Sequence, residues 1–442
     1  MTAGTHAKLD ADAIAAAGDP TLEALHENIG AYCLRHHRFG FDPANPIVRL
    51  HEPTFGAEEI IAAVDVLLST RVTMGPLVRK FERSFAGMHG FAHAISVNSG
   101  SSANLLAVAA IANVATKAGL RPGDEVIVPA LSWSTTVWPL IQHNLKPVVV
   151  DIDPRTLNID PGEVERAIGP RTRAVVPVHV YGNPCDLTAL REICERRGLV
   201  MIEDCCEALG ATFDGTPVGS FGLASTFSFY FSHHVTTLEG GVCVTNDFEL
   251  AETMRILRAH GWIRELEDRE RYVDLHPDID PRFLFVNLGY NLRITEPQAA
   301  IGLVQLPKLA GFVEARRRNT QAWHEDLGRW NDIFDLQLEM PNARSSCFGL
   351  PLVVHERAPF AVRDIKEFLG RANIETRAII AGNIAVQPGL QLYAHRVVGD
   401  LAHSTRVMRR GFAIGNHQGV DAAARQYVSG KIAEFMAQNG SR

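Results

Sequence analysis

Glycine and hydroxyl side chains stand where strand-like runs of the sequence end, and these residue types bind phosphate groups. In NSGSSANLL (98–106), Gly100 and Ser101 open a predicted helix, whose free backbone N–H groups attract anions. Ser228 closes another predicted strand and offers a further hydroxyl. A serine-rich helix start is more often a plain N-cap, so this feature alone favours a phosphate site only weakly.

Two more strand ends carry side chains that could hold a planar ring. In VMIEDCC (200–206), Asp204 closes an apolar strand, and Glu203 must point the other way because side chains alternate along a strand. Asp204 either caps the next helix or keeps a pyridine nitrogen protonated, which makes a cofactor ring an electron sink. Trp133 follows another strand and either stacks on such a ring or fills the core.

A pair of histidines follows the strand that ends at Ser228. His233 and His234 lie in SFYFSHHVTTLEGG (228–241), on a polar stretch that ends in a double glycine. An imidazole with an ordinary pKa of about 6.5 is suited to general base catalysis. A single histidine in such a place is most often structural, and two adjacent ones favour a functional role modestly.

The elements that must position these residues alternate between short β-branched runs and amphipathic helices from about residue 95. This alternation predicts a mostly parallel sheet with helices on both faces, and ligands bind such sheets at the carboxyl ends of the strands. After residue 305 a long helix pattern and a mixture of strands and helices predict a smaller α+β domain. We therefore expect an N-terminal extension (1–47), a large cofactor-binding domain (48–305) and a small C-terminal domain (306–442).

Composition excludes several classes of function. The 442 residues carry a formal net charge of −7, which gives no electrostatic footprint for nucleic acid. No apolar run is long enough to span a membrane, and the first residues do not resemble a secretory signal. The seven cysteines are scattered without a C-x-x-C pair, so we expect reduced thiols, no metal site and a cytoplasmic protein.

Together these motifs resemble the DegT/DnrJ/EryC1/StrS family of sugar aminotransferases, from about residue 48 to the C-terminus. The segment GYNLRITEPQAAIGL (289–303) is similar to the family's segment that reaches a neighbouring active site. The resemblance implies a fold-type-I α/β fold, pyridoxal 5′-phosphate (PLP) and a homodimer. It also implies cofactor-binding roles for Gly100, Ser101 and Ser228 (phosphate), Asp204 (ring nitrogen), Trp133 (stacking), Glu207 (ring hydroxyl or His233) and Asn291 (from the other subunit).

His233 stands where the family's aminotransferases carry the lysine that forms a Schiff base, counting from the double glycine; a one-residue shift would select His234. Histidine forms no Schiff base, so the resemblance implies non-covalent PLP or pyridoxamine 5′-phosphate (PMP), with His233 as catalytic base. Histidine in place of this lysine is typical of the family's 3-dehydratase branch. Enzymes of this branch remove the C3 hydroxyl from a nucleotide-linked 4-keto-6-deoxyhexose, with glutamate as amino donor. Arg377 and His417 either contact substrate or serve surface or packing roles.

Two alternatives stay open. An iron–sulfur, reductase-coupled NDP-4-keto-6-deoxyglucose 3-dehydrase shares the histidine but carries three cysteines soon after it, and the stretch from 262 to 283 has none. A four-thiolate cluster needs four ligands, which disfavours this reading. A non-catalytic PLP-binding relic is disfavoured because Asp204, Ser228 and Trp133 are all retained.

Overall fold

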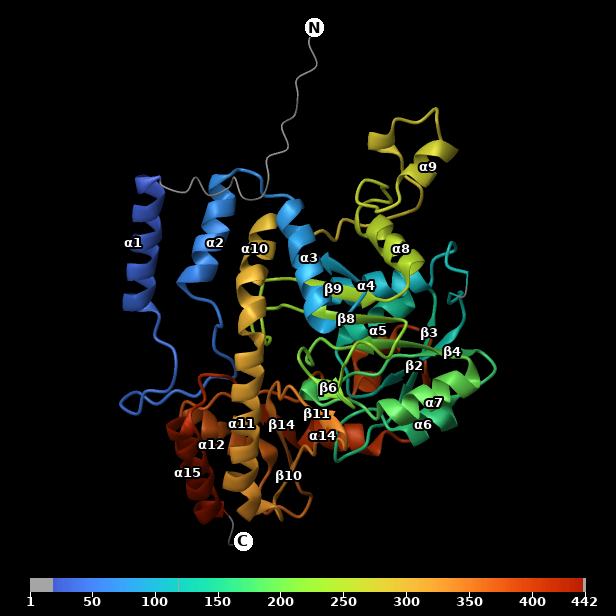
Figure 1. The fold of residues 1–442 in the computed structure, drawn as a ribbon. Helices are drawn as coiled ribbons and strands as arrows, with labels where there is room; N and C mark the ends of the chain where they lie inside the picture. The colour runs from blue at the N-terminus through green and yellow to red at the C-terminus, as the bar shows by residue number, and fades with distance from the viewer. Residues whose placement is uncertain (1–18, 118, 440–442) are drawn as a thin grey trace.

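A mixed eight-stranded sheet forms the centre of the computed structural model, which describes residues 19–117 and 119–439 (Figure 1). The strand order is β1-β9-β8-β5-β4-β2-β3-β13. β9 runs antiparallel to both of its neighbours, and all other pairs are parallel. The strands are β1 (His93–Val97), β2 (Glu125–Pro129), β3 (Lys146–Val150), β4 (Thr172–Val175), β5 (Val200–Asp204), β8 (Ala224–Ser228), β9 (Gly241–Thr245) and β13 (Arg396–Val397).

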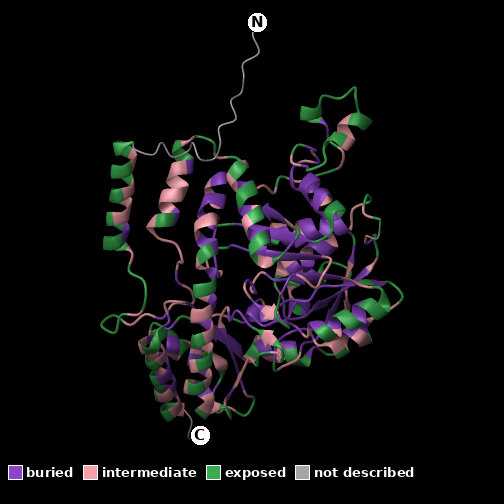
Figure 2. Ribbon diagram, in the orientation of Figure 1, coloured by how far each residue is buried: buried purple, intermediate pink, exposed green. Residues whose placement is uncertain are grey.

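Apolar residues on both faces explain why this sheet is buried (Figure 2). In β2, Val126 and Val128 pack into one hydrophobic cluster, while Ile127 between them packs into the cluster on the opposite face. Helices cover both clusters, as the alternating pattern predicts. They are α3 (Pro76–His89), α4 (Gly100–Ile111), α5 (Ser134–Gln142), α6 (Pro161–Ala167), α7 (Leu187–Arg197) and α8 (Phe248–Arg258).

The helix α4 is shorter than its sequence pattern indicates. The helical pattern runs on to residue 119, but α4 (Gly100–Ile111) ends at Ile111. The Ser99 hydroxyl caps its N-terminus by accepting from the Ser102 N–H at 3.0 Å. The chain turns back after Ile111 because the Ile111 carbonyl accepts from the N–H of Leu120 at 3.1 Å.

The C-terminal part forms a smaller α+β unit with its own core. Its sheet has the order β10-β12-β14, from Phe334–Leu336, Leu350–Val354 and Gly411–Ile414. The long predicted helix is α11 (Leu309–Leu327), and α12 (Val362–Arg371), α14 (Ala402–Arg410) and α15 (Ala422–Asn439) complete the layer. A separate small sheet joins β11 (Ala343–Arg344), β6 (Thr212–Phe213) and β7 (Thr216–Pro217).

Some segments cross the expected domain boundaries. β13 comes from the C-terminal part but extends the large sheet beside β3, and Arg396 pairs with Glu125 of β2 at 2.7 Å. At the other end, Val48 forms a bridge with Ile374 of the small unit. The two units are therefore joined at several places besides α11.

The N-terminal helices lie along one side of the molecule (Figure 1). α1 (Pro20–His36) is tied to α2 (Ala57–Leu68) by His26 and Asp65 at 2.7 Å, and α2 packs on α10 (Glu296–Gln305). The helical pattern at residues 11–18 lies outside the described residues. α9 (Glu270–Leu275) and α13 (Pro388–Gln391) are short surface helices. Across 19–117 and 119–439, we find no helix with the length and apolarity to span a membrane.

Candidate active site

One cavity of about 350 Å³ brings together most of the residues that the sequence singles out. It opens at the carboxyl ends of the parallel strands, where ligands bind in sheets of this kind. The predicted site residues that line it are Gly100, Ser101, Trp133, Asp204, Glu207, Ser228, His233 and Arg377.

The predicted phosphate cradle lies at the N-terminus of α4. Gly100 must lack a side chain, because a Cβ there would lie 2.6 Å from the Cβ of Ser228. The hydroxyls of Ser101 and Thr135 face each other at 3.0 Å at the same edge. Backbone N–H groups and hydroxyls thus converge without any carboxylate among these residues, which suits an anion.

Asp204 is held rigidly at the end of β5. Its side chain is 4% exposed, and one carboxylate oxygen accepts from Thr136 at 2.8 Å and Asn104 at 3.0 Å. The other oxygen accepts from the backbone N–H of Cys206 at 3.2 Å. Sequence reasoning missed Asn104 and Thr136. The signal for Asn104 was a single amide on the otherwise apolar helix α4.

Glu203 points to the opposite side of β5, as expected from alternation. Its buried carboxylate accepts from the N–H groups of Gly219 at 2.9 Å and Gly222 at 2.7 Å, and lies 3.2 Å from His179. Burial alone would raise the pKa of Glu203, but His179 and these donors lower it below its ordinary value. Glu203 therefore anchors the loop after β7 and takes no part in the cavity.

His179, Glu203 and Cys205 are the one group of potential metal ligands in the described chain. The Nδ1 atom of His179 already accepts from the backbone N–H of Cys185 at 3.0 Å. Protein donors thus occupy the lone pairs that a metal would need. No four-cysteine group occurs among the described residues, so the expected ligand set of an iron–sulfur cluster is not brought together.

Glu207 borders the cavity one turn after Asp204. Its carboxylate accepts from the backbone N–H of Tyr181 at 2.9 Å. Burial raises the pKa of Glu207 to about 7, with Arg377 opposing this shift. Near neutral pH it can therefore donate or accept a hydrogen bond in the cavity.

The two histidines occupy different environments. His233 lines the cavity, and its ring centroid lies 5.1 Å from that of Phe348. Burial, Arg316 and Arg377 together lower the pKa of His233 to about 3, so its imidazole is neutral at physiological pH. His234 is fully buried, does not line the cavity and donates from Nε2 to the Ser346 carbonyl at 2.9 Å. The geometry therefore favours His233 as the base, and its role stays a prediction.

Residues from the small unit and residues at the mouth of the cavity complete its lining. Arg377 is fixed by backbone hydrogen bonds with Ala413, and no ion pair with a described residue engages its guanidinium. Trp133 is half exposed at the N-terminus of α5 and lines the cavity. Tyr230 and Phe348, which the sequence did not single out, supply further aromatic surface.

Two predicted residues lie outside this cavity. Asn291 is exposed, and its side-chain oxygen accepts from the Arg293 Nε at 2.9 Å on the loop before α10. His417 is buried, with Nε2 3.1 Å from the Arg49 carbonyl and Nδ1 accepting from the Gly419 N–H. These contacts tie His417 to the segment before α2 and leave no free ring nitrogen for a substrate.

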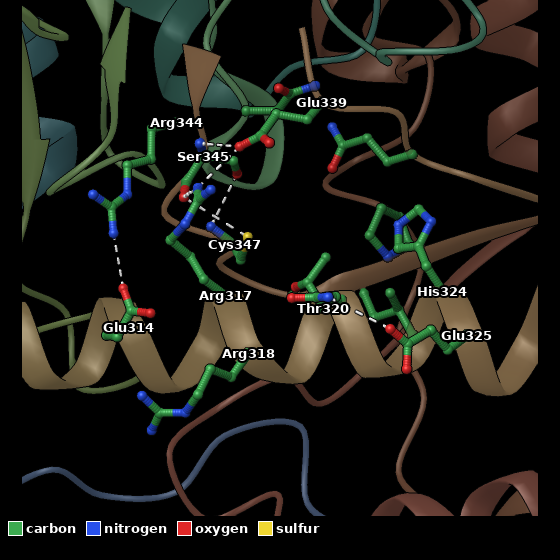
Figure 3. Close-up of a pocket in the computed structure, with 16 residues that line it drawn as sticks. Glu314, Arg317, Arg318, Thr320, His324, Glu325, Glu339, Arg344, Ser345 and Cys347 are labelled. Carbon is green, nitrogen blue, oxygen red and sulfur yellow. Dashed lines mark hydrogen bonds and ion pairs between the residues drawn. The ribbon is translucent and has the colours of Figure 1, made fainter. Parts of the chain in front are cut away.

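A larger cavity of about 750 Å³ lies beside α11 (Figure 3). It is lined by none of the predicted site residues. Its charged side chains mostly neutralise one another: Arg317 pairs with Glu339 at 2.9 Å, and Arg344 pairs with Glu314 at 2.9 Å. The smaller cavity therefore remains the better candidate for the active site.

Known proteins resemble this chain over most of its length. GDP-4-keto-6-deoxy-D-mannose 3-dehydratase of Yersinia pseudotuberculosis is 39% identical over 373 residues, which cover 84% of this chain and 94% of that protein. dTDP-4-dehydro-2,6-dideoxy-D-glucose 3-dehydratase of Saccharopolyspora spinosa is 37% identical, and the aligned residues cover 86% of this chain and 85% of that protein.

A solved structure of GDP-4-keto-6-deoxymannose-3-dehydratase contains a trapped PLP-glutamate geminal diamine. It superposes with a TM-score of 0.79 at 34% identity, covering 86% of this chain and 99% of the other. This likeness confirms the predicted aminotransferase fold.

The profile of the DegT/DnrJ/EryC1/StrS aminotransferase family matches residues 53–433. The match begins close to residue 48, where the sequence motifs placed the start of the resemblance. It includes every residue that lines the 350 Å³ cavity. The chain belongs to the DegT/DnrJ/EryC1/StrS aminotransferase family.

Proposed function

We propose that the protein is a PLP-dependent 3-dehydratase that removes the C3 hydroxyl from a nucleotide-linked 4-keto-6-deoxyhexose. The observation that carries this function is a cavity that combines the expected cofactor contacts, Asn291 excepted, with His233 in place of a lysine. No lysine is among the described residues that line the cavity. This supports a cofactor that is held by non-covalent contacts and not by a Schiff base with the protein.

The cavity fits PLP or PMP at both ends. Gly100, Ser101 and Ser228 line the cavity together, and the close approach of Gly100 to Ser228 leaves no space for a side chain at position 100. Asp204, oriented by Asn104 and Thr136, offers its carboxylate to a ring nitrogen. When bound, the cofactor supplies an electron sink for loss of the sugar hydroxyl.

The chain's own residues then hold the ring and move a proton. Trp133 would stack on the ring, and Glu207 would hydrogen-bond the ring hydroxyl or His233. His233, whose pKa is lowered to about 3, is neutral near physiological pH, so one ring nitrogen has a lone pair that can accept a proton. Phe348 and Tyr230 restrict water beside the imidazole. Arg377 offers a free cation to an anionic group of the amino donor or the nucleotide sugar.

The relatives support the identity of the reactants. The 39% identity to GDP-4-keto-6-deoxy-D-mannose 3-dehydratase favours a GDP-linked substrate, and the PLP-glutamate adduct in a related structure favours glutamate as amino donor. The dTDP-linked relative is nearly as similar, so turnover of both nucleotide sugars should be compared directly.

We also propose a homodimer in the cytoplasm. Asn291 lies outside its own cavity on an exposed loop, which suits a residue that completes the site of a second copy. Leu288 on the same loop is 87% exposed, as expected of an apolar contact with a partner. The free thiols suit a reducing compartment.

Visible absorbance of the purified protein with PLP tests this function. After borohydride treatment and dialysis, we expect the cofactor to leave, because no lysine retains it. Glutamate should convert the PLP absorbance to that of PMP, and the loaded protein should release a 3,6-dideoxy sugar and ammonia.

Each opposite result has a definite meaning. Cofactor that borohydride fixes to the wild-type protein would contradict the proposed role of His233. Iron–sulfur absorption bands, or turnover only with an added reductase, would favour the reductase-coupled reaction. Glutamate turnover without sugar deoxygenation would indicate that the protein acts as an aminotransferase.

A further inference from the structure

A buried arginine lies behind the two histidines, outside the cavity. Arg316 belongs to α11 and is 2% exposed. Within the described chain no carboxylate pairs with it, and burial lowers its pKa to about 10. A charge buried without a counter-ion is costly, so its retention calls for a specific reason.

The contacts of Arg316 lead directly to the wall of the cavity. One guanidinium nitrogen donates to the carbonyls of Phe348 and Asn416, both at 2.7 Å. The Asn416 amide in turn donates to the carbonyls of Arg316 at 3.1 Å and Cys347 at 2.9 Å. Arg316 and Asn416 thus clamp the segment 345–348 from both sides.

This segment contacts both histidines. The Phe348 ring lies 5.1 Å from the ring of His233 and 5.6 Å from that of His234, and the Ser346 carbonyl accepts from His234. The Arg316 guanidinium lies 5.9 Å from the centroid of the same Phe348 ring. Cys347 adopts a φ of +52°, a left-handed conformation that a side chain disfavours, so the segment needs the clamp to hold its shape.

We infer that Arg316 is a positioning residue for His233: it fixes Phe348 against the imidazole and places an uncompensated positive charge behind it. This inference rests on the proposed function. The clamp would hold the ring towards the reacting atoms, and the charge would keep the imidazole neutral while lowering its basicity. The lowered pKa values of His233, His234 and His417 all include a contribution from Arg316, which agrees with this arrangement.

Other charged and titratable groups surround position 233 and stay unchanged in the test. Arg377 adds a second positive charge from the small unit. The remaining groups on the elements packed around it are Asp204, Cys206, Glu207, Tyr230, His234, Glu239 and Cys347.

The effect of the Arg316 charge can be measured in a protein that carries the substitution His233→Lys. A lysine at 233 should bind PLP covalently, and the protonation of that linkage is read from its visible absorbance as a function of pH. Replacing Arg316 with Gln in this background should raise the apparent pKa of the linkage by about one unit or more, because a nearby positive charge disfavours protonation. Arg316→Lys, which restores the charge, should bring the pKa back.

Arg317→Gln is the matched control. Arg317 follows in the same helix and donates to the Ser345 carbonyl of the same segment at 2.6 Å, but Glu339 neutralises its charge (Figure 3). We expect no change in the linkage pKa for this variant. If Arg316→Gln does not fold, Arg316→Met removes the charge without leaving a buried polar group.

The outcomes separate the two proposals. An unchanged pKa in Arg316→Gln or Arg316→Met, with cofactor bound, overturns the inference and leaves the proposed function intact. An equal shift in Arg317→Gln also overturns it, because the effect would then come from the segment and not from the charge. If borohydride fixes no PLP to the His233→Lys protein, the cofactor assignment of the cavity fails and the inference falls with it.

Discussion

His233 and His234 are neighbours in the chain but have different tasks in the structure. His233 borders the cavity, whereas His234 donates to the Ser346 carbonyl in the interior. The sequence pattern places both histidines on a polar loop, and counting back from the double glycine at 240–241 selects His233. Only the three-dimensional structure shows which ring turns inward, because residues of a loop have no fixed alternation.

Replacing the two histidines in turn tests this difference. His233→Asn should still bind PLP but slow sugar deoxygenation by about 10²- to 10⁴-fold, the usual contribution of a general base. His234→Asn can still donate to Ser346 and should keep the rate within a few-fold. Single-turnover assays with PMP-loaded protein measure both. Equal losses in the two variants would contradict the assignment.

Glu207 makes stability depend on pH in a definite direction. Its folded-state pKa is about 7 and its ordinary value 4.5, so between these pH values the folded chain binds more protons than the unfolded chain. Stability should therefore fall as pH rises through this window. Glu207→Gln should remove up to about 3 kcal/mol of this fall, at about 1.4 kcal/mol per pKa unit.

Urea unfolding at pH 5 and pH 8 measures the Glu207 effect as the difference between wild type and variant. Glu195→Gln, on the exposed surface of α7, serves as the control and should leave the pH dependence unchanged. Parallel pH profiles for wild type and Glu207→Gln would show that Glu207 does not titrate in this range.

At the scale of elements, strands were the easiest part to predict. Their short β-branched runs fill both faces of the sheet, and the strand ends placed Gly100, Asp204 and Ser228 at one edge. Two of the residues that were missed, Phe348 and Arg316, come from the small unit. Phe348 reaches the cavity and Arg316 packs behind it through contacts between distant segments, which leave no local pattern in the sequence.

The start of α4 gives a test of the phosphate cradle. Gly100→Ala should weaken PLP binding about tenfold or more, because its Cβ would crowd Ser228 and overpacking costs about 1–3 kcal/mol. Equilibrium dialysis of PLP measures the loss. Gly87→Ala in α3, with nothing within 4 Å, is the control and should stabilise the fold by about 0.5–1 kcal/mol without changing PLP affinity. Unaltered PLP binding in Gly100→Ala would place the phosphate elsewhere.

At the scale of the whole molecule, a second copy should complete the active site. Leu288→Glu should shift the protein from dimer to monomer and weaken PLP binding at the same time, because Asn291 lies three residues further along the same exposed loop. Sedimentation velocity, with and without PLP, measures both effects. Leu34→Glu, on a side chain 82% exposed in α1, is the control. Monomeric wild-type protein with full PLP affinity would contradict the dimer.

The strand β13 has a consequence for motion. It fastens the C-terminal part to the large sheet beside β3, the Ile384 N–H donates to the Ala130 carbonyl at 2.8 Å, and Arg396 pairs with Glu125. A hinge motion between the two units would have to break these bonds, which join residues that lie far apart along the chain. Closure over a bound sugar therefore falls to side chains and short loops such as 228–240. The two halves of the cavity stay in register while substrates enter and leave.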